Sequence, residues 1–159
     1  MLNLRVYGIL MDDDKRVLVS DEFIRGNYFT KFPGGGMEFG EGTRDCLKRE
    51  FKEETNLDVT IGDHIYTTDF FQMSAFNPAH QIVSIYYFVH TSGLAHLATK
   101  TALFDFEPHQ VADVTACAEV FRWVDWNVLN EESVSLPIDK MVVKMLKQNG
   151  AFKSNMSSL

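Results

Sequence analysis

The sequence has few cysteines and no excess of positive charge, and each shortage excludes a class of protein. Its two cysteines, Cys46 and Cys117, stand in neither a CxxC pair nor a zinc-ligand spacing, which excludes a disulfide framework and a structural zinc site. We expect both to be small buried residues. Lysine and arginine number 15 against 22 acidic residues, a net charge of -7. Such a chain gives no basis for binding to nucleic acid.

Long apolar runs are also missing. No stretch approaches the ~18 apolar residues of a membrane-spanning helix, and the amino terminus lacks the basic segment and apolar run of a secretory signal. We therefore expect a cytoplasmic protein without a membrane partner, and we leave a homodimer open. With 159 residues, 45% of them hydrophobic, the chain has the size of one compact domain. We assign it to residues 1–150 and expect a frayed tail at 151–159.

Apolar stretches separated by turn residues predict several strands. The first two are expected to form a hairpin across an acidic turn at Asp12, to which we assign no chemistry. The last part of the chain predicts a helix at 139–148. This order of elements is typical of an α+β domain with a mixed β-sheet. The expected strands lie at residues 4–10, 16–20, 57–61, 64–71, 81–89 and 118–124.

A glycine-rich segment precedes the most charged helix of the sequence. Residues 32–42 hold five glycines and a proline, a composition that predicts a shaped loop. A helix of residues 44–55 follows, with Thr43 as its N-cap and an apolar face that includes Leu47 and Phe51. Asn56 is expected to end this helix in the left-handed conformation.

Three carboxylates share one stripe of this helix. Glu50, Glu53 and Glu54 stand at i, i+3 and i+4, and the helical period places them on one side. Their mutual repulsion is mildly unfavourable, but it disappears when divalent cations lie between them, and carboxylates are the ligands that Mg²⁺ prefers. The neighbouring Arg49 can clamp one carboxylate in a bidentate pair. By itself the pattern is more typical of a solvated helix face than of a metal site. The glycine loop upstream makes the metal site the better interpretation.

With that loop, the pattern resembles a known family. From Gly35 to Leu57 the sequence matches the Nudix box, Gly-x5-Glu-x7-Arg-Glu-U-x-Glu-Glu-x-Gly-U with U aliphatic or aromatic, at every defined position but one. The departure is Asn56, where the family has glycine. Since asparagine tolerates positive φ better than other side chains, the departure puts little in doubt, and no catalytic carboxylate is missing.

The resemblance implies both a fold and an activity. The fold is the Nudix fold, an α/β/α sandwich with a mixed β-sheet, and the activity is hydrolysis of a nucleoside diphosphate linked to another moiety. Residue roles follow from the same resemblance: Glu50, Glu53 and Glu54 bind Mg²⁺ or Mn²⁺, Glu41 gives outer support, Arg49 orients Glu50, and Gly35 and Gly36 shape the loop.

The box does not identify the proton acceptor or the substrate. Glu53 is the first candidate base because it lies on the metal-binding stripe, and Glu119, at the start of the last expected strand, is the candidate outside the box. The next acids to consider lie on a loop, at Asp105, Glu107 and Asp113. Nucleoside triphosphates, nucleotide sugars and dinucleoside polyphosphates all remain open as substrates, because selectivity comes from loops outside the box.

Other functions fit the sequence less well. No GxGxxG or Gly-Lys-Ser/Thr motif supports a dinucleotide fold or a P-loop. The five histidines show no paired ligand spacing, and Trp123 and Trp126 are expected in the core. The main alternative is a catalytically inactive Nudix-fold domain that senses a ligand, although such domains commonly lose box carboxylates. A diphosphate isomerase on this fold departs further from the box than this chain does.

Overall fold

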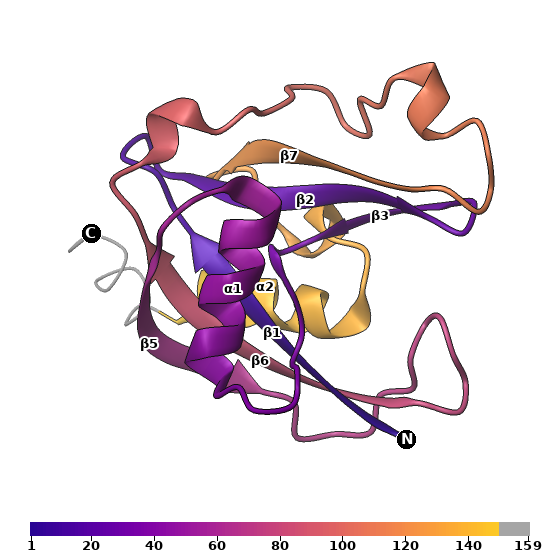
Figure 1. The fold of residues 1–159 in the computed structure, drawn as a ribbon. Helices are drawn as coiled ribbons and strands as arrows, with labels where there is room; N and C mark the ends of the chain where they lie inside the picture. Colours follow the sequence, from indigo (N-terminus) through magenta and orange to yellow (C-terminus); the bar gives the residue numbers. More distant parts are fainter. Residues whose placement is uncertain (150–159) are drawn as a thin grey trace. The chain divides into compact units, whose positions relative to one another are not determined.

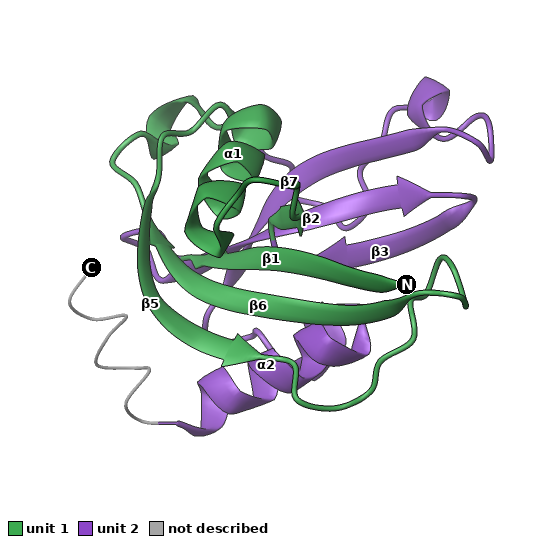
Figure 2. Ribbon diagram, turned by 60° about the horizontal axis from the view of Figure 1, so that its bottom comes forward, with its two compact units in different colours: residues 1–10, 33–97 green, residues 11–32, 98–159 purple. Residues whose placement is uncertain are grey.

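The computed structural model describes residues 1–149 (Figure 1). They form two compact units (Figure 2). Unit 1 consists of Met1–Leu10 and Pro33–Leu97, and unit 2 of Met11–Phe32 and the chain from Ala98 onward. The tail expected at 151–159 lies outside the described residues. None of the helices within residues 1–149 is long and apolar enough to cross a membrane.

Unit 1 contains a four-stranded sheet and one long helix. Its elements are β1 (Leu2–Leu10), β4 (Gly34–Gly36), α1 (Thr43–Thr55), β5 (Thr60–Thr67), β6 (Gln81–His90) and a short 3-10 helix, η1 (Leu94–His96). The strand order is β4-β1-β6-β5, with β1 parallel to β6 and the other pairs antiparallel. The expected mixed sheet and α+β class are therefore confirmed.

Helix α1 lies across one face of this sheet (Figure 2). Its buried side chains are Cys46, Leu47 and Phe51, as the apolar pattern predicted. A Cβ on Gly8 of β1 would come within 2.8 Å of the Phe51 ring and 2.5 Å of Val89. Glycine at this position therefore lets α1 approach β1 closely, which holds the charged helix on a rigid support.

Unit 2 contains a three-stranded antiparallel sheet of β2 (Arg16–Ile24), β3 (Asn27–Lys31) and β7 (Cys117–Asp125), in the order β3-β2-β7. A buried ion pair links two of these strands, because Arg122 of β7 donates to the Asp21 carboxylate of β2 at 2.8 and 3.0 Å. The Thr30 hydroxyl of β3 donates to the same carboxylate at 2.8 Å. These bonds satisfy a carboxylate that is fully buried. The other elements of unit 2 are η2 (Pro108–Gln110), η3 (Glu131–Ser133) and α2 (Pro137–Gln148).

The expected hairpin between the first two strands is wrong. Strand β1 pairs with β4 and β6, whereas β2 pairs with β3 and β7. Every residue from Val6 to Leu10 is buried, and a strand buried on both faces is typical of an interior position with a parallel neighbour. The turn itself is present, because the Asp12 carboxylate accepts from the Arg16 backbone N–H at 2.8 Å.

Strand boundaries also differ from the expectation. The segments 57–61 and 64–71 were predicted as two strands, but one strand, β5, covers only Thr60–Thr67, and residues 57–59 and 68–71 lie outside it. The register of β5 against β6 shifts on both sides of His64. Two further strands were not predicted, β3 and β4. Strand β4 consists of glycines alone, so only its backbone pairing with β1 defines it, and side-chain periodicity cannot reveal it.

At the start of α1, the expected N-cap is wrong by one residue. The cap is Gly42, and Thr43 is the first helical residue, with its hydroxyl 2.7 Å from the Tyr87 hydroxyl. The Thr43 side chain is thus engaged across unit 1 and does not cap the helix. At the other end, Asn56 adopts φ 57° and ψ 20°, which confirms the left-handed ending. Helix α2 begins at Pro137, two residues before the expected start at 139.

Three expectations about burial were wrong. Cys46 is buried as expected, but Cys117 is exposed at the start of β7. Trp123 and Trp126 are half-buried rather than core residues. Each ring has a cationic side chain over it, Arg16 at 5.6 Å from the Trp123 centroid and Lys147 at 4.4 Å from the Trp126 centroid, so long basic side chains cover part of their surface.

Candidate active site

The charged stripe of α1 begins at Arg49, which joins the glutamates to the loop before the helix. Its Nε and Nη2 donate to the Glu41 carboxylate, and Nη2 also donates to the Gly36 carbonyl at 3.0 Å. Its Nη1 donates to Glu50 at 2.9 Å and to Glu53 at 3.2 Å. These contacts use every N–H of the guanidinium, so Arg49 has no donor left for a ligand.

The pKa values of this group reflect the same contacts. The hydrogen bond from Arg49 lowers the pKa of Glu41 to about 2, helped by the contact of its carboxylate with the Glu38 backbone. The hydrogen bond to Glu41 likewise raises the pKa of Arg49. Burial raises the pKa of the nearby Cys46 thiol to about 12, which leaves that thiol protonated and unreactive.

The two glycines of the box loop have different roles. A Cβ on Gly35 would lie 2.4 to 2.6 Å from the carboxylate atoms of Glu50, which is closer than any real contact. Only glycine therefore lets Glu50 rest against β4. A Cβ on Gly36 would meet its nearest neighbour, Nη1 of Arg5, at an ordinary 3.7 Å.

Arg5 also lies beside this loop, and the sequence reasoning did not single it out. It lies on β1 opposite Gly36 of β4, and its Nε donates to the Tyr7 hydroxyl at 2.6 Å. Burial lowers the pKa of Arg5, but Tyr7 and the charges on Glu50 and Glu54 raise it above the usual value. Arg5 is the one charged residue in a strand of mostly apolar residues, and this is the signal that could have identified it.

Glu119, the candidate base outside the box, lies on β7 in unit 2. Its carboxylate accepts from the Ser20 hydroxyl at 2.7 Å and stands opposite Glu22 in the register of β2 and β7. Burial raises the pKa of Glu119, against the lowering effects of Ser20 and Lys31. Lys31 in turn forms an ion pair with Glu22. Glu119 is thus a half-buried carboxylate with an enhanced proton affinity.

The three loop acids proposed as further candidates also belong to unit 2. Glu107 lies 3.8 Å from Lys100. The Asp113 carboxylate accepts from the Thr115 backbone N–H at 2.8 Å, which lowers the pKa of Asp113. A carboxylate that already caps a turn is a weaker proton acceptor than Glu119.

Comparison with known proteins identifies this arrangement. The family model of the NUDIX domain matches residues 1–143. The chain belongs to the Nudix family. The stripe of α1 with its glycine loop is accordingly its Nudix box, and the expectation of a Nudix hydrolase is confirmed. A search of curated proteins found no match.

Solved structures confirm the Nudix fold. A MutT Nudix hydrolase from Burkholderia pseudomallei superposes with a TM-score of 0.62 at 14% identity, covering 91% of this chain and 97% of that one. A MutT protein from Methanosarcina mazei Go1 gives 0.61 at 14% identity, with 92% and 94% covered. An ADP-ribose pyrophosphatase from Streptococcus suis 89-1591 gives 0.52 at 15% identity, with 93% of each chain covered. At these identities the similarity shows the fold alone.

The side chains of this Nudix box have the chemistry that a divalent cation requires. Glu50, Glu53 and Glu54 offer only carboxylate oxygens, the ligands of hard cations, and Gly35 leaves room for Glu50 where any Cβ would fill it. Within residues 1–149, no three acidic, histidine or cysteine side chains already converge on one point. Arg49 already donates to two of the three carboxylates, those of Glu50 and Glu53.

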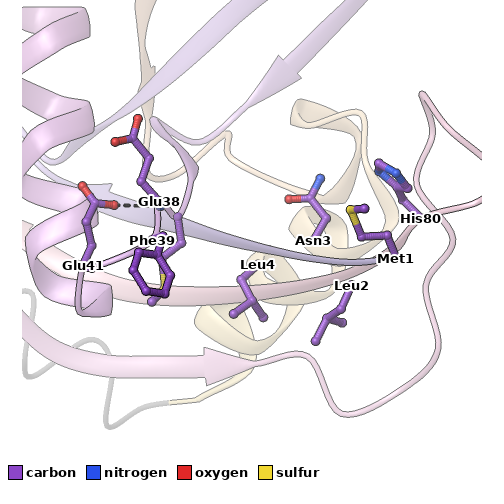
Figure 3. Close-up of a pocket in the computed structure, with 10 residues that line it drawn as sticks. Met1, Leu2, Asn3, Leu4, Glu38, Phe39, Glu41 and His80 are labelled. Atoms are coloured by element: carbon purple, nitrogen blue, oxygen red, sulfur yellow. Dashed lines mark hydrogen bonds between the residues drawn. The ribbon is translucent and has the colours of Figure 1, made fainter.

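A pocket lies beside the box loop. It measures about 510 Å³ and is lined by the first residues of β1, by loop residues 37–41 and by His80 (Figure 3). Glu38 and Glu41 lie at its edge, where the Glu38 backbone N–H donates to Glu41 at 2.9 Å, and Phe39 on the same loop is fully exposed. The three glutamates of α1 do not line it, so the pocket borders the loop part of the Nudix box and is distinct from the carboxylate stripe.

Proposed function

We propose that this chain cleaves a diphosphate linkage in a nucleoside diphosphate derivative by attack of water on phosphorus, with Mg²⁺ or Mn²⁺ held by Glu50, Glu53 and Glu54. The observation that carries the proposal is the complete carboxylate stripe on a rigid helix, braced at one end by Arg49. A bound cation would neutralise the diphosphate and acidify the attacking water. The rest of the reaction depends on side chains of the chain itself.

Arg49 positions Glu50, the first of the three proposed metal ligands. Its Nη1 bond to Glu50 and its bonds to Glu41 hold the helix stripe and the loop in one arrangement. The buried side chains of α1 anchor the helix that carries the stripe. Pre-positioned charge of this kind contributes strongly to catalysis because it needs no reorganisation during the reaction.

Glu53 is our first candidate for the proton acceptor. Its side chain is 58% exposed, so water reaches it, and it lies on the same stripe as Glu50 and Glu54. A carboxylate next to the attacking water can remove its proton as the new bond to phosphorus forms. Glu119 is the second candidate, supported by its raised pKa.

The test is a substrate panel of nucleoside triphosphates, nucleotide sugars and dinucleoside polyphosphates. Each compound is incubated with the purified protein and Mg²⁺, Mn²⁺ or EDTA, and the nucleotide products are separated and quantified by anion-exchange chromatography. We expect turnover of at least one compound that requires a cation and is absent with EDTA. Failure to turn over any compound would favour the ligand-sensing domain, and binding of a panel member without turnover would support it directly.

A further inference from the structure

We propose that Arg5 binds a phosphate group of the substrate and that Tyr7 holds its guanidinium in position for this contact. The inference rests on the proposed function, because it requires a phosphorylated ligand at the Nudix box. It assigns a role to a residue on β1, outside the box.

The supply of hydrogen-bond donors distinguishes Arg5 from Arg49. All N–H groups of the Arg49 guanidinium donate hydrogen bonds, to Glu41, Glu50, Glu53 and the Gly36 carbonyl. Arg5 donates only its Nε within residues 1–149, to Tyr7 at 2.6 Å. Both Nη atoms of Arg5 keep their hydrogens for a ligand, and two neighbouring donors of this kind match two oxygens of a phosphate.

The position of Arg5 is set by strand pairing. Arg5 and Gly36 are partners across β1 and β4, and Nη1 of Arg5 lies 3.7 Å from the place of a Cβ on Gly36. Gly36 is also the residue whose carbonyl accepts from Arg49. Arg5 is therefore next to the box loop. The charges of Glu50 and Glu54 act on it, although it forms an ion pair with neither in the described chain.

The other cationic side chains of unit 1 do not serve this purpose. Arg44 donates to the carbonyls of Ile61 and Gly62, both at 2.9 Å. Lys52 pairs with Asp58 at 3.2 Å. Lys48 is exposed, and the helical period turns it about 160° away from Glu50 on α1. Among the arginines and lysines of unit 1, Arg5 alone combines free donors with a position near the carboxylate stripe.

The role follows from charge. A diphosphate brings at least two negative charges to a site that already holds three carboxylates, and cations on the carboxylates offset only part of that charge. An arginine that lies near these carboxylates without pairing to them keeps its charge available for the incoming phosphate. The hydroxyl of Tyr7 restricts the guanidinium, so less conformational entropy is lost when phosphate binds.

Calorimetric titration with methylenediphosphonate, a non-hydrolysable diphosphate, in the presence of Mg²⁺ tests the proposal. We expect Arg5→Met to weaken its affinity about 10-fold or more, and Arg5→Lys to fall between that variant and the wild type. Lys48→Met is the matched control, since it removes one positive charge from the far face of α1, and its affinity should stay within about 2-fold of the wild type. Unchanged affinity in Arg5→Met overturns the proposal.

A metal titration shows whether Arg5 contacts phosphate itself or acts indirectly by holding the metal-binding glutamates in place. Without diphosphonate, Arg5→Met should bind Mn²⁺ as tightly as the wild type or more tightly, because a repelling charge is gone. Loss of Mn²⁺ affinity in that variant would show that Arg5 acts through the glutamates, and the proposal would fail. Should Arg5→Met not fold, Tyr7→Phe replaces it, with an expected loss of diphosphonate affinity of about 2- to 5-fold; unchanged affinity there would overturn the role of Tyr7.

Steady-state kinetics then distinguish this inference from the proposed function. For any compound that the wild type hydrolyses, Arg5→Met should raise KM about 10-fold or more and leave kcat within about 3-fold. If the wild type hydrolyses a compound and the variant shows an unchanged KM, the inference alone fails. If the wild type hydrolyses nothing but binds diphosphonate in an Arg5-dependent way, the proposed function fails and the phosphate contact stands.

Discussion

Glu54 is the single residue on which the proposed metal site can be tested most simply. It shares the helical stripe of Glu50 and Glu53, and glutamine at position 54 has nearly the same shape without the charge. We expect Glu54→Gln to fold normally and to lower turnover at least ~10²-fold, because electrostatic stabilisation dominates such sites. The measurement is kcat at saturating Mg²⁺. Glu132→Gln, which changes an 88% exposed side chain, is the control, and wild-type turnover in Glu54→Gln would remove this residue from the metal site.

Glu41 carries a pH dependence whose sign can be worked out. Its pKa in the folded protein is about 2, below the ordinary 4.5, mainly because Arg49 donates to its carboxylate. A lowered pKa stabilises the folded state above the ordinary value, and this contribution is lost as the pH falls from about 4.5 towards 2. We expect Glu41→Gln to melt below the wild type at neutral pH, with the difference shrinking as the pH is lowered to about 3. Parallel melting curves at all pH values would contradict the ion pair.

Among the elements, β4 supports the site through one glycine and not through its neighbour. Gly35→Ala forces a Cβ into the Glu50 carboxylate, whereas Gly36→Ala meets only an ordinary contact. We expect Gly35→Ala to lower kcat by about 10-fold or more while circular dichroism shows a folded protein, because Glu50 must leave its position. Gly36→Ala is the matched control and should keep kcat within about 3-fold of the wild type. Equal losses in both would mean that β4 tolerates no side chain at all.

Helix α1 depends on its C-terminal cap. Asn56 stands at φ 57°, a conformation that glycine adopts freely and a β-branched residue resists. We expect Asn56→Gly to be neutral or slightly stabilising and Asn56→Val to lower the free energy of unfolding by roughly 1 kcal/mol or more. Chemical denaturation of both variants gives the comparison. Equal stabilities would remove the argument that the left-handed cap matters.

At the scale of the whole molecule, the open question is which unit supplies the base. Glu53 lies in unit 1 and Glu119 in unit 2. The variant that loses the base should lose about 10²-fold or more in kcat, together with the acidic limb of the pH profile, whereas loss of an auxiliary ligand should mainly raise the metal requirement. The measurement is kcat against pH for Glu53→Gln and Glu119→Gln at saturating metal. If both variants keep the limb, the base lies elsewhere, and Asp105, Glu107 and Asp113 become the next positions to test.

The acidic limb also has an expected position. Because burial raises the pKa of Glu119, a limb that belongs to Glu119 should lie above the ordinary value for glutamate.

Local sequence determined the most about α1. A helical period of 3.6 residues places Glu50, Glu53 and Glu54 on one stripe wherever the helix lies, and the glycine loop at fixed distance upstream identified the family before any contact was known. Apolar spacing likewise predicted the buried face at Leu47 and Phe51. The left-handed ending at Asn56 followed from conformational preference alone.

Tertiary structure decided what depends on partners far away in the chain. The pairing of β1 with β4 and β6 replaced the expected hairpin, and the same pairing brings Arg5 beside Gly36, a placement that local pattern cannot reveal. The raised pKa of Glu119 likewise comes from burial and not from its sequence neighbours. Helix periodicity is a local property, whereas strand partners, burial and the space a glycine leaves are set by residues that meet only when the chain has folded.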